Sequence, residues 1–390
     1  MDPFVHLHTH TEYSLFDGIS RIPDLVSYVK ELGQTSLAIT DHGVMHGAVY
    51  LYKECLRQGI HPVIGCEVYV TEGSRFDRKV EGKEKLYHLI LLAENNEGYR
   101  NLVKICSKGW TEGFYRKPRT DHDLLRRYSK GLIALSACVA GEVPQALLAG
   151  DREKAGRIAA FYRDTFGKDN YFLELQNHGL PEEAAVRPAL AELAQECGVG
   201  LVATNDFHYV RREDARSQEI KLCISTGQTL DNPNHFRFQN DEFYCKSGPE
   251  MEALLGRFPG AIENTARIAE RCQVTFEFGV HRLPSFPVPD GYTARSYLRE
   301  LCEKALPLRY QPVAHLLRDR LAPQGKSLFT KFPAIRTGCI SIRNRTRRQT
   351  VDTKFKRDLT KSRHAGCMFN GPWKTSPERH HFRAALSPKI

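Results

Sequence analysis

The chain lacks the cysteine pairing that marks disulfide frameworks and zinc fingers. Its eleven cysteines are scattered and form no C-x-x-C pair, so we expect reduced thiols. It also lacks a basic leader followed by an apolar core, and no run of about 18 apolar residues occurs. We therefore expect neither a signal peptide nor a membrane span, and we predict a cytoplasmic protein.

Three common nucleotide and hydrolase motifs are absent as well. There is no G-x-x-x-x-G-K-[ST] loop for a nucleoside triphosphate and no G-x-S-x-G nucleophile turn. No G-x-G-x-x-G follows the first predicted strand, which leaves a dinucleotide-binding sheet without support.

Most of the chain lacks a net positive charge, although the formal net charge of the whole chain is +10. Residues 315–390 hold 18 Lys and Arg against 4 Asp and Glu, which leaves 38 basic and 42 acidic residues in 1–314. The overall basicity is therefore no evidence that the body of the protein binds nucleic acid.

The basic segment differs in character from the rest. From about His315 apolar residues are sparse, and stretches such as 342–350 form no amphipathic face, so we expect a disordered tail. It is either a tail that binds nucleic acid or the product of a shifted reading frame. We prefer the second, because the composition changes abruptly inside a helical segment. If the other reading frames of the coding DNA encode no continuation of the protein, the frameshift hypothesis is wrong.

What the chain does contain is an alternation of strand-like and helix-like segments. Apolar runs predict strands at 4–8, 36–40, 62–70, 87–93, 131–137, 171–175 and 200–205. Amphipathic segments predict helices, among them 22–33, 47–59, 151–167, 181–198 and 292–306. With 390 residues, the chain can form one large domain and a smaller one. The alternation predicts a parallel α/β sheet, either open or closed into a barrel.

Polar residues of metal-ligand type follow these strands. HTH comes after the first strand, DH (41–42) after the second, and NDFH (205–208) after the seventh. The loops after barrel strands open onto a common mouth, so this distribution favours the barrel. Within HLHTHTEYS, strand periodicity would place His6, His8 and His10 on one face. Neutral imidazoles that share metal ions would be more stable there than crowded charged rings.

Several stretches together resemble a known family. They are HLHTHTEYSLFDG, AITDHGVMHGAVYLYKEC, PVIGCEVYV, YHLILLAENNEGYRNLVKICS, SACVAGEVPQALLAGD and LVATNDFHYV. They resemble the PHP (polymerase and histidinol phosphatase) domain, and more narrowly the N-terminal part of bacterial DNA polymerase III alpha subunits. The resemblance covers about residues 1–313. It implies an α/β fold, with a distorted (β/α)7 barrel over 1–282 and a linker and the start of a palm-like domain over 283–313. The basic tail then occupies 314–390.

The resemblance also implies three divalent metal ions held by nine ligands. The matching positions are His8, His10, Asp17, His42, Glu67, His88, Cys138, Asp206 and His208. Taken singly, some have simpler interpretations: Asp17 could be a turn residue, His88 a core histidine and Cys138 a small buried hydrophobe.

Four neighbouring residues are interpreted differently. Asp41 is expected to cap the next helix, which leaves His42 as the better ligand. His6 is expected to support a ligand rather than bind metal. His46 and His178 are interpreted as bystanders.

The implied ligand set has a definite charge and chemistry. Three acids and one thiolate against three divalent ions leave about +2, which suits an anionic phosphodiester. A water with a pKa lowered toward about 7 by such ions can attack phosphorus. Imidazole-rich ligation with a thiolate favours Zn, Fe or Mn over Mg, and the resemblance implies Zn or Mn, with Fe as a further option. The resemblance implies metal-dependent phosphodiester hydrolysis as a 3′→5′ proofreading exonuclease.

The polymerase chemistry of the family is not expected here. The P-D-x-D-x-D motif and the G-R-G-S-type loop that it needs are absent, and in TDHD either Asp121 or Asp123 is better interpreted as a helix cap than as a metal ligand. Two other functions stay open: a small-molecule phosphatase of the histidinol-phosphatase type, and a metal-stabilised scaffold without catalysis. Expected partners are DNA and, by resemblance, a proofreading exonuclease subunit and other replisome subunits, with no membrane.

Overall fold

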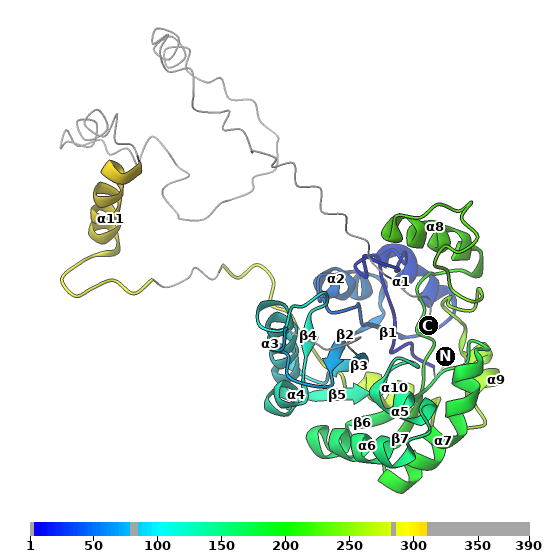
Figure 1. The fold of residues 1–390 in the computed structure, drawn as a ribbon. Helices are drawn as coiled ribbons and strands as arrows, with labels where there is room; N and C mark the ends of the chain where they lie inside the picture. Colours follow the sequence, from blue (N-terminus) through cyan, green and yellow to red (C-terminus); the bar gives the residue numbers. More distant parts are fainter. Residues whose placement is uncertain (1–3, 79–84, 282–285, 310–390) are drawn as a thin grey trace. The chain divides into compact units, whose positions relative to one another are not determined.

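A mixed β-sheet curls through the first of two units, residues 1–278 (Figure 1). The structure, a computed structural model, describes residues 4–78, 85–281 and 286–309. The strand β4 (Arg119–Thr120) pairs with β2 at one side of the main path. Along that path the strands follow the order β1 (Ser36–Ile39), β2 (His61–Thr71), β3 (Leu86–Ala93), β5 (Leu132–Leu135), β6 (Tyr171–Leu175) and β7 (Gly200–Ala203).

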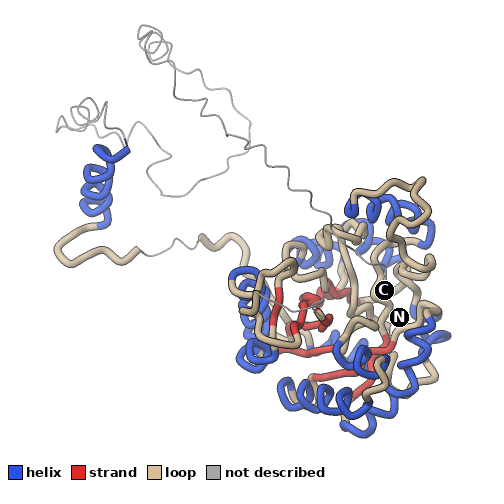
Figure 2. Tube along the Cα trace, in the orientation of Figure 1, coloured by secondary structure: helices blue, strands red, loops and turns tan. Residues whose placement is uncertain are grey.

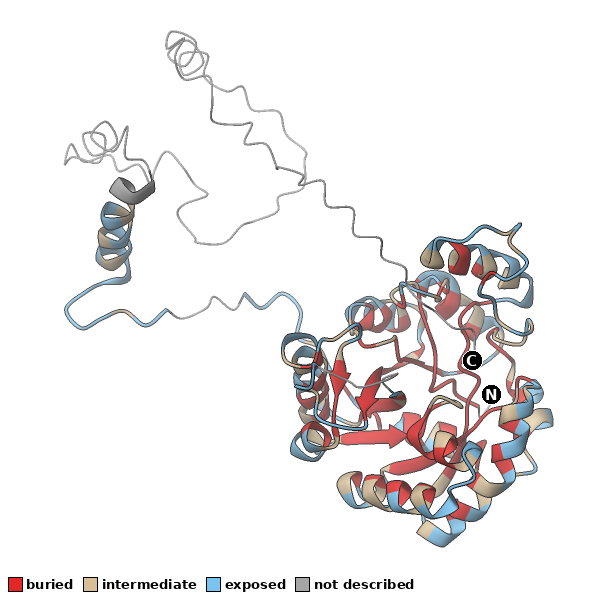
Figure 3. Ribbon diagram, in the orientation of Figure 1, coloured by how far each residue is buried: buried red, intermediate tan, exposed pale blue. Residues whose placement is uncertain are grey.

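Helices surround this sheet (Figure 2). Helix α1 (Ile22–Glu31) precedes β1, and those between the strands are α2 (Ala48–Gln58), α3 (Asn96–Thr111), α4 (His122–Tyr128), α5 (Glu142–Leu148), α6 (Arg152–Phe166) and α7 (Pro181–Cys197). After β7 come a 3₁₀ turn, η1 (Arg212–Asp214), and α8 (Ala215–Thr226), α9 (Gly248–Leu255) and α10 (Glu263–Arg271). The strands are buried, whereas the helices turn an exposed face outward (Figure 3). The helices predicted at 22–33, 47–59, 151–167 and 181–198 are confirmed as α1, α2, α6 and α7.

The N-terminal segment joins the two edges of the sheet. The predicted strand at 4–8 is not a regular strand, but parallel bridges pair His6 with Leu37 of β1 and Thr9 with Phe207 beyond β7. The Ala38 amide donates to the His6 carbonyl, and the His10 amide donates to the Phe207 carbonyl, both at 3.0 Å. The prediction of an α/β barrel is therefore confirmed, with its first strand reduced to isolated bridges.

The prediction of an all-parallel sheet is wrong at β3. This strand runs antiparallel to β2, with Thr71 opposite Leu86, and antiparallel to β5 on its other side. Parallel neighbours need a crossover, usually a helix. The described parts of the β2–β3 connection, residues 72–78 and 85, contain no helix, and the chain therefore turns back instead of crossing over.

Strand periodicity divides the apolar core in two. In β3, Leu89 and Leu91 belong to the large core between sheet and helices, whereas Ile90 and Leu92 face a smaller core on the other side of the sheet. The smaller core also takes Ile268 and neighbours from α10, so the buried face of this helix covers the smaller core while its other face is exposed.

The second unit, 279–390, contains one described helix, α11 (Ala294–Arg309), which agrees with the helix predicted at 292–306. The predictions for residues 310–390, including the disordered or frameshifted tail, lie outside the described residues, as do positions 283–285 of the predicted linker. No helix in the described ranges is both long and apolar enough to cross a membrane.

Candidate metal centre

Three backbone bridges bring the predicted ligand segments together. Parallel bridges pair His42 with Glu67, His88 with Gly141, and Thr9 with Phe207. The first aligns the segment after β1 with β2, and the third aligns the H-x-H pair with the D-x-H pair. Side chains from distant parts of the sequence therefore leave the backbone at the same level of the barrel.

The direction of these side chains follows from strand periodicity. Glu67 has the same parity in β2 as Val63, and His88 has the same parity in β3 as Ile90 and Leu92, all of which belong to the smaller inner core. Glu67 is 1 % exposed and lies where the apolar inner core ends. The ligand candidates thus point into the curl of the sheet, above its apolar filling.

All nine predicted ligands meet in one cluster. Each has a ligand-type atom at 3.8 Å or less from that of another member. Glu67 contacts the imidazoles of four members, at 3.7 Å for His8, 3.6 Å for His10 and 2.5 Å for His88, with His42 closer still. Cys138 is at the edge, with Sγ 3.8 Å from His88 Nδ1. We call these nine residues the ligand cluster.

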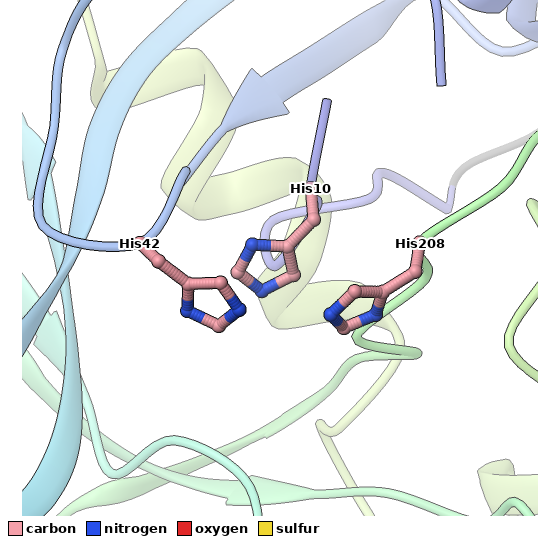
Figure 4. Close-up of side chains that lie close together, drawn as sticks. All are labelled: His10, His42 and His208. Atoms are coloured by element: carbon pink, nitrogen blue, oxygen red, sulfur yellow. The ribbon is translucent and has the colours of Figure 1, made fainter. Parts of the chain in front are cut away.

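Three imidazoles form the middle of the cluster (Figure 4). The His10 ring is stacked against His42 at 4.0 Å and against His208 at 4.3 Å between centroids. Asp17 Oδ2 lies 3.3 Å from His42 Nε2 and 3.8 Å from His208 Nε2. Within the described ranges, three overlapping groups can each hold a metal ion: His10, His42 and His208; His8, His10 and Asp206; and His42, Glu67 and His88.

Hydrogen bonds outside the cluster orient the imidazoles. His8 Nδ1 lies 2.7 Å from Glu174 Oε1, His10 Nδ1 lies 3.0 Å from Ser14 Oγ, and His208 Nδ1 lies 2.9 Å from the Asp206 carbonyl. When Nδ1 donates in each of these contacts, the lone pair of Nε2 faces the cluster. Ser14 Oγ donates in turn to Asp41 Oδ1 at 2.8 Å, so it can accept from His10.

The buried atoms inside the cluster fit divalent cations. His8 Nε2 and His10 Nε2 are 3.1 and 3.0 Å from Asp206 Oδ1, yet these atoms and both Glu67 oxygens lack an aligned hydrogen bond. Buried polar atoms are normally satisfied. Nitrogen and carboxylate atoms that lie close together but are not oriented for hydrogen bonds can instead bind the same cation. Imidazole, carboxylate and thiol groups are donor types that suit Zn, Mn or Fe.

Charge coupling among these groups is strong. Burial alone would raise the pKa of Glu67 and Asp206, but the surrounding imidazoles hold both pKa values well below the usual range. Burial lowers the pKa of His10 to about 3, assisted by His42 and His208. For His8 and His42 burial also acts downward, but the carboxylates outweigh it and raise the pKa well above 6.5. A bound cation would replace those protons.

Strained backbone accompanies two ligands. Among described residues other than glycine, only Arg116, Ala137 and Asp206 have positive φ, at 63°, 63° and 40°. Asp206 is itself a ligand candidate, and Ala137 precedes Cys138. Such conformations cost of order 1–3 kcal/mol and persist where the surroundings require them. Here they aim Asp206 and Cys138 into the cluster.

The cluster is buried on one side and accessible on the other. The side chains of His8 and His10 are 0 % exposed, whereas those of Asp17 and His42 are 15 % and that of His88 is 22 % exposed. A molecule that enters from solvent therefore contacts Asp17, His42 and His88 first.

Two expectations for neighbouring residues are wrong. Asp41 caps no helix: α2 begins after Gly47, and the Asp41 carboxylate accepts from the Thr11 amide at 2.7 Å and from the Thr11 and Ser14 hydroxyls. Within the described ranges His6 does not contact a member of the cluster: its Nε2 lies 2.8 Å from the Lys246 carbonyl, and its ring packs between Phe4 and Phe207. His8 and His10 lie together in the cluster, whereas His6 turns away from it, so the three residues do not share one face.

The expectation for Asp121 is confirmed, and one residue that contacts the cluster was not predicted. Asp121 does cap α4, through the Leu124 amide at 2.9 Å. Glu174, which orients His8, was not predicted. Its position in the buried run YFLEL could have revealed it, because it has the inward parity of Phe172. A carboxylate at an inward position of a buried strand needs a partner.

Residues 6–178 match the family model described as the PHP domain. The chain is 46% identical over 319 residues to the DNA polymerase III subunit alpha of Treponema pallidum, which covers 81% of this chain and 27% of the relative. It is 46% identical to that of Thermus aquaticus, covering 79% and 26%. For Mycobacterium tuberculosis the identity is 40%, with 79% and 27% covered. The chain thus spans about a quarter of the length of these relatives.

Similarity to solved structures is weaker. An amidohydrolase from Chromobacterium violaceum has a TM-score of 0.35 at 13% identity, covering 56% of this chain and 96% of that one. A two-domain protein from Bacteroides vulgatus, described as containing a PHP-like metal-dependent phosphoesterase, has a TM-score of 0.33 at 12% identity, covering 68% and 65%. Because these TM-scores are low, the fold is assigned from the helices and strands of this chain and from the sequence matches.

Proposed function

Because the chain carries a PHP domain related to that of bacterial DNA polymerase III alpha subunits, we propose that its ligand cluster hydrolyses phosphodiester bonds. The substrate is the 3′ end of DNA, and the activity is a 3′→5′ exonuclease that proofreads during replication. Polymerase activity is not part of the proposal, since the P-D-x-D-x-D motif is absent from the chain.

One observation carries the proposal. Seven side chains of ligand type form three overlapping groups around one partly accessible centre. Asp17 and Cys138 join them through His42, His208 and His88, and several buried atoms of the cluster lack an aligned hydrogen bond. A structural core would satisfy those atoms directly. Their arrangement is costly unless cations occupy it, which favours a site that works on an anionic substrate.

The ligand set suits three divalent ions, Zn or Mn above Fe. Two of the three candidate groups share His10 and two share His42, so the groups overlap and the ions would be close neighbours. A neutral imidazole offers one lone pair and would serve one ion, whereas a carboxylate such as Glu67 has two oxygens and could be shared. Bound there, such cations would lower the pKa of a water and polarise the oxygens of a phosphodiester.

The chain itself supplies position and access. Glu174 and Ser14 keep His8 and His10 turned toward the centre from the buried side, so these groups need no reorganisation when substrate arrives. Asp17, His42 and His88 present the accessible side. A phosphodiester anion therefore approaches over these three residues while the buried ligands remain fixed.

The wider context is part of the same proposal. The partners are DNA and, as in a replisome, a proofreading exonuclease subunit and other replication subunits. The domain limits stay as predicted, with the phosphoesterase over 1–282, a linker and the start of a palm-like domain over 283–313, and a tail over 314–390.

The test combines metal analysis with two substrates. The full chain, loaded with Zn²⁺ or Mn²⁺ and freed of excess, is analysed for bound metal and then given 5′-labelled single-stranded DNA or a phosphomonoester. We expect bound metal, stepwise loss of 3′ nucleotides, and little turnover of the monoester. Asp206→Asn should abolish both metal retention and nuclease activity.

His46→Ala is the matched control, because His46 is exposed and has no part in the ligand cluster. Its metal content and activity should equal those of the unmodified chain. Faster turnover of the monoester than of DNA would favour the small-molecule phosphatase. Bound metal and a higher unfolding temperature, without hydrolysis of either substrate, would favour the scaffold. A chain that retains no metal would refute the proposal outright.

A further inference from the structure

Exposed aromatic rings stand beside the accessible side of the ligand cluster. Phe16 precedes the ligand Asp17 and is 38 % exposed, and Phe236, from the segment after α8, is 42 % exposed. Their ring centroids are 6.3 Å apart. Two large apolar rings left in solvent and close to one another are typical of a binding surface.

The same segment reaches the cluster from the side of His208. The Phe238 ring lies edge-on to the imidazole of His208, with the centroids 5.0 Å apart. Phe236 is two residues away in HFRF, and its ring faces Phe16. The pair of exposed rings is thus connected to the ligands at both ends, through Asp17 and through His208.

The ammonium group of Lys117 lies near the Phe16 ring. Lys117 Nζ is 5.7 Å from the centroid of the Phe16 ring, 5.0 Å from that of Tyr69 and 3.3 Å from the Tyr69 hydroxyl. The Tyr69 ring is in turn 5.3 Å from the ring of His88. In the described ranges no carboxylate pairs with Lys117, which is exposed. Its ammonium group is therefore one aromatic ring away from the ligands and is available to an anion.

The backbone next to Lys117 is strained. Arg116 has φ of 63° and is the tip of a tight turn in which Tyr115 and Lys117 exchange backbone hydrogen bonds at 3.1 and 2.7 Å. The two other positive-φ residues, Ala137 and Asp206, flank or form the ligand cluster. Strain of this kind gathers at functional sites, and here the turn holds Lys117 beside Phe16 with a second exposed cation, Arg116, next to it in the chain.

We propose that Phe16 and Phe236 form a stacking platform for the base of the 3′-terminal nucleotide, and that Lys117 and Arg116 contact the adjacent phosphates. We call these four residues the end clamp. Proteins that bind single strands combine aromatic stacking with a cationic track. A paired terminal base is held by its partner and by the neighbour on which it stacks, whereas an unpaired one moves at little cost, so the end clamp favours an unpaired end. This inference deepens the proposed function and rests on it.

Binding without cleavage tests the clamp separately from hydrolysis. Fluorescence anisotropy in EDTA compares the full chain on two single-stranded oligonucleotides, one with a normal 3′ nucleotide and one whose 3′ nucleotide is abasic. We expect the normal end to bind roughly tenfold more tightly, and the double variant Phe16→Ala/Phe236→Ala to lose this preference. Lys117→Gln should weaken both oligonucleotides alike and reduce the salt slope by about one.

Phe278→Ala and Lys130→Gln are the matched controls. Phe278 is exposed but packs against Tyr52, and Lys130 pairs with Glu97. Both should keep the preference and the affinity of the unmodified chain. The clamp is refuted if the unmodified chain binds the two ends equally or not at all, or if the double variant keeps the preference. Preferential binding without hydrolysis under Zn²⁺ or Mn²⁺ would support the clamp and refute the proposed nuclease.

Discussion

The two sides of the ligand cluster are built differently. On the buried side, His8 and His10 each use Nδ1 for a hydrogen bond to a buried partner, Glu174 and Ser14, and leave Nε2 to the centre. On the accessible side, His42 Nδ1 and His88 Nδ1 each face Glu67 directly, and Asp17 Oδ1 has no hydrogen-bond partner among the described residues.

This difference predicts that the side chains on the buried side keep their orientation without metal, whereas the orientation of those on the accessible side depends on a bound cation. The buried side is held by hydrogen bonds that exist whether or not metal is bound, so its geometry belongs to the fold. The accessible side is held by charge attraction to Glu67 and can rearrange. We therefore expect the buried side to determine metal affinity and the accessible side to determine how substrate is received.

The largest expected effect follows from Glu67, the one carboxylate that contacts four imidazoles from both sides. Glu67→Gln removes that charge and leaves the imidazoles without their common partner, so metal affinity should fall by roughly 100-fold or more. Competition with a chelator, followed by metal analysis, measures it. Glu72→Gln, an exposed Glu paired with Lys154, is the control. Equal metal affinity in the two variants would contradict a central role for Glu67.

A somewhat smaller effect is expected at Glu174, which touches the metal ligands only through His8. Glu174→Gln weakens the orientation and basicity of His8, and comparable second partners are worth 10–100-fold in metal affinity. The same competition assay measures the change, and an Asp17→Asn chain provides the comparison from the accessible side. If Asp17→Asn loses more affinity than Glu174→Gln, the buried side is not the one that determines affinity.

His6 sharpens the comparison because it is buried next to the cluster without belonging to it. Burial lowers its pKa to about 4, below about 6.5 in the unfolded chain. The unfolded state therefore binds more protons, and His6 should reduce the free energy of unfolding by about 2 kcal/mol between pH 7 and pH 5.

Urea unfolding in EDTA at the two pH values tests this. His6→Gln should show a drop between pH 7 and pH 5 that is smaller by about that amount, whatever its stability at pH 7. An unchanged drop would show that His6 titrates normally in the folded chain.

The smallest effect belongs to the scaffold alone. Asn95 caps α3 by accepting from the amides of Glu97 and Gly98 at 2.9 and 3.0 Å. Asn95→Ala should cost about 1 kcal/mol of unfolding free energy. Metal affinity should not change, because no ligand is on α3. A parallel loss of metal affinity would show that the cluster is coupled to helix packing throughout the barrel.

Much of this arrangement could be predicted from the sequence, because strand and helix periodicities are local. The apolar runs located β1 to β3 and β5 to β7, and the resemblance supplied the nine residues that the fold brings together. The reversal of β3 could not be predicted in this way, since an apolar run such as YHLILLA has the same appearance in either direction. Asp41 was misassigned for a related reason: an acid before a helix also suits a cap, and only the fold brings Thr11 and Ser14 within reach.

The reversed strand has a consequence for how this protein can diversify. Thr71 and Leu86, the two ends of the β2–β3 connection, are paired with each other beyond Glu67 and His88. Chain added between them would close on a preformed base, at an entropic cost that grows only slowly with its length. A variant of this barrel can therefore carry a longer or different excursion between these two strands while all nine positions of the ligand cluster keep their place.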